Sequence, residues 1–285
     1  MTDVRVPPGG SEPLQRPAGE LGKRVVSAIV LGIAAIGSAW IGGIVFPLVW
    51  LAAATAVWWE WTGIMKAVPR SLLAGVGGVA FVCMALALAL DAPAIAFVCA
   101  VIGAGVAMAA VQERRVWAGA GVIYAALALI PPVMLRDDAG FGLIAILWLF
   151  AVVWAQDTGA YFAGRLFGGP KLAPAISPSK TWSGAAGGMI AGIAAGVSTL
   201  LLAKVVFHPM HVVVAVSVIA SAMLGDLLES WIKRRFGVKD AGALIPGHGG
   251  AMDRLDGFLI AAAVALAIGL ARGGTDNPAA GQLLW

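Results

Sequence analysis

Long apolar runs, separated by short segments that contain charges, glycine or proline, dominate this chain. A helix that crosses a membrane needs about 20 mostly apolar residues, and nine runs approach that length. They cover residues 25–42, 44–65, 72–90, 94–111, 117–135, 141–163, 182–204, 211–232 and 255–271. The pattern predicts an all-α integral membrane protein, a polytopic bundle of about nine transmembrane helices.

Composition supports a lipid environment for these helices. Hydrophobic residues make up 60% of the 285 residues and charged residues only 12%, whereas a soluble domain carries roughly 25% charged residues. The net charge of +4 does not indicate nucleic-acid binding, because the basic residues are scattered between apolar runs. We therefore expect membrane lipids around the protein and no nucleic-acid partner.

The polar segments divide the chain into regions. Residues 1–22 are rich in proline and glycine and predict a flexible cytoplasmic tail. Residues 23–140 contain about five predicted helices, residues 141–272 contain the others, and residues 273–285 form a short C-terminal tail. Two long polar loops, 164–181 and 233–254, interrupt the second group of helices. Any chemistry is expected at the membrane face that carries these loops.

The positions of the basic residues predict the orientation. Cytoplasmic loops of membrane proteins carry an excess of Lys and Arg. With the N-terminus inside and nine crossings, 16 of the 19 basic residues fall on the inner side, and Arg136, Lys204 and Arg272 fall outside. This division predicts an N-in, C-out topology and places both long loops in the cytoplasm.

Acidic residues within predicted spans are candidates for function because charge is costly in a membrane. Glu60 lies in a tryptophan cluster near the inner end of the second helix, which suits either a structural pairing with a neighbouring helix or a site. Asp157 and Tyr161 are four residues apart and share a helix face. An interhelical hydrogen bond and a polar cavity open to the cytoplasm both remain interpretations of that pair.

The eighth predicted helix carries a denser polar array. Asp226, Ser230 and Lys233 are spaced i, i+4 and i+7, so they lie on one face that descends to the cytoplasmic boundary. Lys233, Arg234 and Arg235 taken alone also suit a topological anchor. The array gains weight from the loop that follows it.

That loop combines carboxylates, cations and glycines. Its polar residues are Lys239, Asp240, His248, Asp253, Arg254 and Asp256. Glycines allow backbone N–H groups to approach an anion closely, and Asp253 and Asp256, three residues apart where the ninth helix begins, can face one point. Carboxylates without cysteine or a second histidine at ligand spacing favour Mg²⁺ over zinc. The loop predicts a site for phosphate and Mg²⁺.

The 164–181 loop has similar chemistry. Ser177, Ser179, Lys180 and Thr181 offer hydroxyl and ammonium groups just before the seventh predicted helix, whose N-terminus attracts anions. The spacing is not that of a Walker P-loop. The loop alone is a weak signal that agrees with the stronger one.

The two segments together resemble the phosphatidate cytidylyltransferase family. The segment from Ser230 to Asp256 reads S-W-I-K-R-R-F-G-V-K-D-A-G-A-L-I-P-G-H-G-G-A-M-D-R-L-D and is similar to the family signature. The runs D-T-G-A-Y-F from Asp157, S-P-S-K-T-W from Ser177 and L-G-D-L-L-E-S from Leu224 also resemble family segments. Ser183 departs from the pattern, because relatives usually carry Glu there.

The resemblance implies that the protein makes CDP-diacylglycerol and pyrophosphate from CTP and phosphatidic acid with Mg²⁺, and a monovalent cation such as K⁺ is a further candidate. It implies a bacterial inner-membrane enzyme with a cytoplasmic active site, for which a homodimer is one expectation. The metal ligands would be Asp226 and Asp253, with Asp256 beside them. The expected catalytic residues are Asp226, Lys233, Asp253 and His248, and the expected substrate-binding residues are Asp157, Tyr161, Ser177, Ser179, Lys180, Thr181, Ser230, Arg234, Lys239, Asp240 and Arg254.

Two other functions fit parts of the pattern. A CTP-dependent polyprenol or phytol kinase would also use these groups, and its products would be lipid phosphate and CDP. A transporter of anionic solutes would need broken helices and inverted repeats, which the sequence does not display. The pattern of a CDP-alcohol phosphotransferase is missing.

Overall fold

The computed structural model describes residues 18–247 and 249–285, and helices make up most of that part of the chain. The helices are α1 (Ala18–Ile41), α2 (Val45–Ile64), α3 (Arg70–Ala89), α4 (Pro93–Ala109), α5 (Arg115–Ala126), α6 (Ile130–Asp137), α7 (Gly142–Phe167), α8 (Trp182–Leu202), α9 (Met210–Arg235), α10 (Met252–Gly273) and α11 (Pro278–Leu283). Strands β1 (Lys171–Ala173) and β2 (Ser177–Thr181) form an antiparallel hairpin between α7 and α8.

Several of these helices suit a bilayer. Six helical segments are long and apolar enough to cross a membrane: 70–89, 115–137, 142–167, 182–202, 210–235 and 252–273. Residues 25–41 and 93–109 form shorter apolar helices. Large apolar side chains, such as Val26, Ile33 and Val101, are more than half exposed on the isolated chain, and lipid is the environment that would cover them. The chain is an all-α integral membrane protein.

Each of the nine predicted segments coincides with helical structure. The predicted span 117–135 falls within one candidate membrane span, 115–137, but a turn divides this span into α5 and α6. Residues 127–129 form a turn between α5 and α6. Pro131 and Pro132 lie in the first turn of α6, where their missing N–H groups are tolerated, whereas in the middle of a longer helix they would remove hydrogen bonds.

The ends of the predicted regions also differ in the structure. Helix α7 extends to Phe167, so much of the predicted 164–181 loop is helix or hairpin. The predicted C-terminal tail contains α11, whose residues Ala279 and Leu283 are buried. Of the predicted N-terminal tail, residues 1–17 lie outside the described residues, and residues from Ala18 onward belong to α1.

A row of glycines on α8 allows it to pack closely against α7. Gly184, Gly188, Gly192 and Gly196 are buried and occur at every fourth position. A Cβ at Gly188 would lie 2.8 Å from the carbonyl oxygen of Gln156, so a larger residue would push the helices apart. Small residues at this spacing are typical of close helix contacts in membranes. The resulting pair holds the β1–β2 hairpin at one end.

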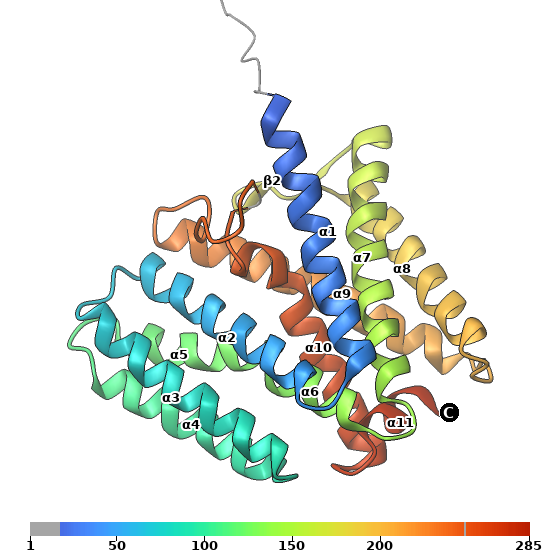
Figure 1. Ribbon diagram of the computed structural model, residues 1–285. Coiled ribbons are helices and arrows are strands. Elements are labelled where there is room, and N and C mark those ends of the chain that lie inside the picture. The colour runs from blue at the N-terminus through green and yellow to red at the C-terminus, as the bar shows by residue number, and fades with distance from the viewer. Residues whose placement is uncertain (1–17, 248) are drawn as a thin grey trace, which may run out of the picture.

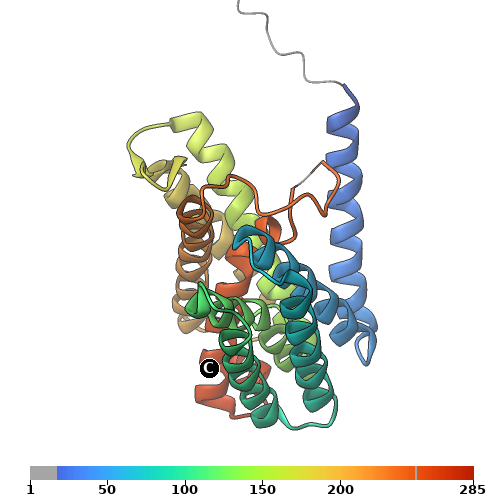
Figure 2. The same cartoon turned by 90° about the vertical axis from the view of Figure 1, so that its left-hand side faces the viewer.

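The remaining helices surround this pair. Figures 1 and 2 show α2 to α5 packed together on one side of α9 and α10. Figure 2 shows α1 standing apart at the outer edge. The segment before α10 reaches toward α1, where the Ser27 hydroxyl donates to the carbonyl oxygen of Pro246 at 2.7 Å. The C-terminal ends of α7 and α9 and the N-terminal ends of α8 and α10 adjoin the polar segments of the chain.

Candidate active site

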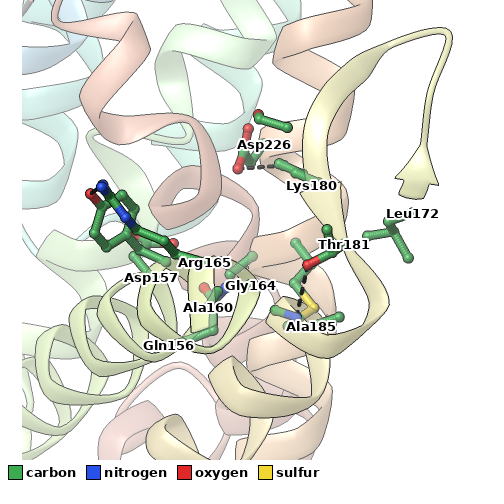
Figure 3. A pocket seen from close by; sticks show the side chains of 15 residues that line it. Gln156, Asp157, Ala160, Gly164, Arg165, Leu172, Lys180, Thr181, Ala185 and Asp226 are labelled. Carbon is green, nitrogen blue, oxygen red and sulfur yellow. Dashed lines mark hydrogen bonds and ion pairs between the residues drawn. The ribbon is translucent and has the colours of Figure 1, made fainter. Parts of the chain in front are cut away.

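A cavity of about 600 Å³ opens between α7, α8, α9 and the β1–β2 hairpin (Figure 3). Its polar lining residues are Gln156, Asp157, Tyr161, Arg165, Ser179, Lys180, Thr181 and Asp226. Six of these were predicted as site residues from three separate parts of the sequence. Folding brings the 157–165 segment, the hairpin and the middle of α9 around one space.

Helix α7 contributes one face to this cavity. Asp157, Tyr161 and Arg165 are spaced four residues apart, so they project to the same side of the helix. The predicted common face of Asp157 and Tyr161 is confirmed by their place in the lining. Arg165 Nη1 donates to the Tyr161 hydroxyl at 2.9 Å, which directs a guanidinium and a phenol to the mouth of the cavity.

The hairpin places a cation against α9. Lys180 Nζ forms an ion pair with Asp226 Oδ2, and both side chains are partly exposed to the cavity. Thr181 ends β2 and caps α8, because its Oγ1 accepts a hydrogen bond from the Gly184 N–H at 3.1 Å. Gly164 makes room for this cap, since a Cβ there would lie 2.9 Å from the Thr181 hydroxyl oxygen. The free N-terminus predicted for anion binding is therefore occupied in part by Thr181.

Ser183, where relatives were expected to carry Glu, has a structural contact. Its hydroxyl donates to the carbonyl oxygen of Gly168 and lies 3.1 Å from the Thr181 hydroxyl. It therefore ties the start of α8 to the segment that leaves α7.

A second polar cluster joins α9 to the start of α10. Lys233 Nζ lies 2.7 Å from Glu229 Oε2 and 2.7 Å from Asp253 Oδ1. Asp253 also accepts hydrogen bonds from the backbone N–H groups of Ala241 and Gly250, at distances of 3.0 and 2.9 Å to Oδ2. Glu229 is fully buried. The cluster neutralises buried charge and fixes the loop before α10.

Glu60 of α2 holds the N-terminus of α10 from the other side. Its Oε1 accepts from the Ala251 N–H at 3.0 Å and its Oε2 from the Met252 N–H at 2.8 Å. Gly242 and Gly250 lie against this carboxylate, and a Cβ at either would approach it within 2.5 Å. Of the two interpretations of Glu60, the structure supports the pairing with a neighbouring helix. Asp253, a predicted metal ligand, is the next residue after Met252.

Asp256 lies near the start of α10, where this helix contacts α9. A Cβ at Gly225 would lie 2.7 Å from the Asp256 carbonyl oxygen, so α9 and α10 are in close contact here. The negative charges that act most strongly on Asp256 are those of Asp226 and Glu229. The expected carboxylates of α9 and α10 therefore come together.

The fit to Mg²⁺ differs among the three predicted ligands. Asp226 and Asp256 are hard oxygen donors on the adjoining helices α9 and α10, and Asp226 lines the cavity. Mg²⁺ is commonly held by one or two carboxylates together with substrate phosphates. Within residues 18–247 and 249–285, no group of three or more acidic, histidine or cysteine side chains could hold a metal alone. Asp253 would join the other two carboxylates only if the Lys233 ammonium moved away from Oδ1.

Other predicted site residues lie outside the cavity lining. Ser177 begins β2, Ser230 lies on α9, and Arg254 lies in the first turn of α10. Arg234 Nη1 donates to the carbonyl oxygen of Val238 at 3.4 Å, and Lys239 and Asp240 are exposed in the loop that follows α9. His248 lies outside the described residues.

Sequence reasoning missed Glu229 and Arg165 as site residues, and it missed the partner of Glu60. Glu229 carries a usable signal, since it precedes Lys233 by four residues and such pairs meet on a helix. Arg165 stands in the same relation to Tyr161. The partner of Glu60 is about 190 residues away in sequence, so no local pattern could have identified it.

Comparison with known proteins decides the family. Residues 22–270 match the Cytidylyltransferase family. The chain belongs to that family. Its relatives include the phosphatidate cytidylyltransferase of Brucella suis, to which it is 40% identical over 90% of this chain and 96% of the relative. The Mycobacterium bovis and Haemophilus influenzae proteins of the same name are 34% and 43% identical, covering 78% and 44% of this chain and 69% and 45% of their own lengths.

Membership in the cytidylyltransferase family agrees with the resemblance expected from the signature. The matched region includes the cavity, the Lys233 cluster and Glu60, and it ends before α11. The family match therefore extends over the N-terminal helices, which the sequence motifs did not cover.

Proposed function

We propose that this protein is a phosphatidate cytidylyltransferase, which transfers CMP from CTP to phosphatidic acid and releases CDP-diacylglycerol and pyrophosphate. The observation that carries the proposal is 40% identity over 90% of the chain to a relative of that name. The cavity supports it, because cations and carboxylates converge there at the ends of apolar helices. A lipid phosphate can reach such a site while its acyl chains stay in the bilayer.

The main requirement of the reaction is neutralisation of the negative charges on the two substrates, and no strong general base is needed. A phosphate oxygen of phosphatidic acid attacks the α-phosphorus of CTP, and the bond from that phosphorus to the oxygen bridging to the β-phosphorus breaks. The second pKa of a phosphomonoester lies near about 6, so the nucleophile is already ionised at neutral pH. Lys180 and Arg165 bring positive charge to the cavity and offset the repulsion between the two polyanions.

Asp226 and Asp256 are the residues that would hold Mg²⁺ in this proposal. Bound Mg²⁺ supplies neutralisation of the phosphate charge and of the departing pyrophosphate. Lys180 forms an ion pair with Asp226 in the structure. We expect its ammonium group to turn toward a phosphate when CTP binds. A monovalent cation such as K⁺ is a further candidate cofactor, whose effect on turnover can be measured by adding it to the assay.

The topology proposed is nine crossings with the N-terminus in the cytoplasm of a bacterial cell and the site on the cytoplasmic side of the inner membrane. The distribution of basic residues supports it. With α5 and α6 counted as one crossing, the helices from α1 to α10 supply nine segments. This arrangement puts the polar segments after α7 and α9 on the same side.

Product analysis with purified protein tests the function. Protein in phospholipid nanodiscs is given phosphatidic acid and CTP labelled at the α-phosphorus, with and without Mg²⁺. The expected result is labelled CDP-diacylglycerol and an equal amount of pyrophosphate, dependent on Mg²⁺ and absent from Asp226→Asn. A lipid kinase would instead release labelled CDP, and this outcome would replace the proposal with the kinase alternative.

A further inference from the structure

A second cavity, of about 250 Å³, lies apart from the proposed active site. Lys66, Arg114, Trp117, Arg235 and Phe236 line it, and we call it the basic pocket. It shares no lining residue with the larger cavity. Three cationic side chains and two aromatic rings thus converge from the ends of α2 and α9 and the start of α5.

The charge in the basic pocket is not balanced by the described part of the protein. No carboxylate lines the pocket, and Lys66 and Arg235 make no ion pair with another described residue. Like charges that share a small space repel one another unless an anion joins them. The pocket therefore has the electrostatics of an anion site.

One of the cations is held in place. Arg114 Nη1 donates to the carbonyl oxygen of Met65, and its guanidinium lies 5.4 Å from the centre of the Phe236 ring. Lys66 and Arg114 both have left-handed backbone conformations, with φ of 50° and 56°, which side chains other than glycine seldom adopt. The contacts of Arg114 with Met65 and Phe236 keep its guanidinium at the pocket. Less side-chain entropy is therefore lost when an anion binds.

The position of the basic pocket indicates where its anion comes from. Two candidate membrane spans have an end there, because the segment 115–137 begins at the pocket and the segment 210–235 ends in it. The ends of spanning helices lie at the level of the lipid headgroups, where tryptophan is also enriched. Basic pockets between transmembrane helices on the cytoplasmic side bind acidic lipid headgroups.

We infer that the basic pocket binds the phosphate of an acidic phospholipid, at a site separate from the one that takes the substrate. Phosphate chemistry alone would also suit a soluble anion, but the location at the ends of two candidate membrane spans favours a lipid headgroup. The inference rests on the proposed topology but does not require the proposed reaction, because the ligand need not react.

Native mass spectrometry of the intact protein tests the inference without CTP. Purified protein is titrated with phosphatidylglycerol, phosphatidylcholine or inorganic phosphate, each alone and the first in competition with the last. We expect one molecule of phosphatidylglycerol to bind in preference to phosphatidylcholine. Lys66→Gln and Arg235→Gln should each weaken that binding about fivefold, and the double variant about 30-fold, at roughly 1 kcal/mol per cation.

Matched variants separate the pocket from general surface charge. Arg115 is exposed, adjoins Arg114 and does not line the pocket, so Arg115→Gln should bind phosphatidylglycerol as the parent protein does. Lys66→Arg combined with Arg235→Lys keeps both charges and should retain binding. Melting temperature, measured on every variant, identifies any that fails to fold, and the single variants then carry the test.

Three results would overturn the inference. One is equal binding of phosphatidylglycerol and phosphatidylcholine by the parent protein. Another is an equal loss in Arg115→Gln and in the double variant. The third is displacement of phosphatidylglycerol by inorganic phosphate at similar concentrations, which would make the pocket a site for a soluble anion. A failure of CDP-diacylglycerol synthesis would leave this binding result unaffected.

Discussion

Replacing Glu60 tests how the N-terminal helices support the proposed active site. This side chain is 3% exposed, and its two oxygens accept the N–H groups of Ala251 and Met252. Those N–H groups belong to the start of α10, which has no side-chain cap of its own. Glu60→Ala leaves the buried Met252 N–H and the partly buried Ala251 N–H without this acceptor.

The magnitude follows from these two hydrogen bonds. A buried donor that loses its acceptor costs roughly 1–3 kcal/mol, and the partly buried Ala251 donor costs less, so the two together cost roughly 1–4 kcal/mol. Removal of a helix cap alone costs about 0.5–2 kcal/mol, which sets the lower part of this range. Because Asp253 follows Met252, the same change loosens the turn that carries this carboxylate. Small displacements of positioned groups can cost about 10²-fold in rate, and we expect kcat to fall by about 10- to 100-fold.

Glu60→Gln separates hydrogen bonding from packing. The amide has nearly the shape of the carboxylate, but only its oxygen can accept, and its NH2 group faces the second backbone N–H. We therefore expect a loss of stability and of kcat between those of the parent and of Glu60→Ala. Unfolding in detergent titrations and steady-state turnover of CTP measure the two effects. Glu113→Gln, at an exposed position, is the control for loss of an acidic residue.

The result that would refute this reasoning is a Glu60→Ala variant with the stability and kcat of the Glu113→Gln control. Loss of stability with an unchanged kcat would limit Glu60 to a structural role, without effect on the position of Asp253.

Three further predictions concern the site and its orientation. Asp226→Asn should abolish turnover without loss of membrane insertion, and near-normal activity at low Mg²⁺ would contradict its role as a ligand. Lys233→Ala should lower kcat/KM at least about 10²-fold and destabilise the fold by about 3–5 kcal/mol, because it leaves buried carboxylates without a cation. Arg235→Ala should affect turnover much less, and equal small losses in both would contradict a catalytic role for Lys233. Single cysteines placed in 164–181 or 233–254 should react with an impermeant reagent only after cells are opened, and labelling of intact cells would refute the cytoplasmic placement.

Much of the fold could be predicted because the bilayer imposes a length on each helix. The apolar runs located helical segments well, since backbone groups in lipid must be satisfied within a helix. The break between α5 and α6 had a visible signal in Pro131 and Pro132, which hydrophobicity alone did not separate from the rest of the run. The β1–β2 hairpin had no such signal, because its strands are short and lack an apolar alternation.

The site could be predicted only where spacing along a helix determines the geometry. Asp157 and Tyr161 follow from a four-residue interval, and both line the cavity. The contact of Lys180 with Asp226 depends on how the hairpin folds back over α9. Lys233 was predicted to share a face with Asp226, but its ammonium group forms ion pairs with Glu229 and Asp253. Such choices among partners depend on tertiary packing, which the helical period does not specify.

The two ion-pair clusters on α9, Asp226 with Lys180 and Lys233 with Glu229 and Asp253, differ in their exposure to the cavity. Asp226 is partly exposed to a cavity that can admit a ligand, whereas Glu229 is buried and paired. Asp253 binds Lys233 while Glu60 holds the preceding turn, so α10 is fixed to both α9 and α2. A shift of α10 would move Asp256 relative to Asp226 and change the space between the two proposed ligands. The ion pairs of Lys233 therefore help to determine the separation of Asp226, which lines the cavity, from Asp256 on α10. The N-terminal helices support the site through Glu60 without lining the cavity.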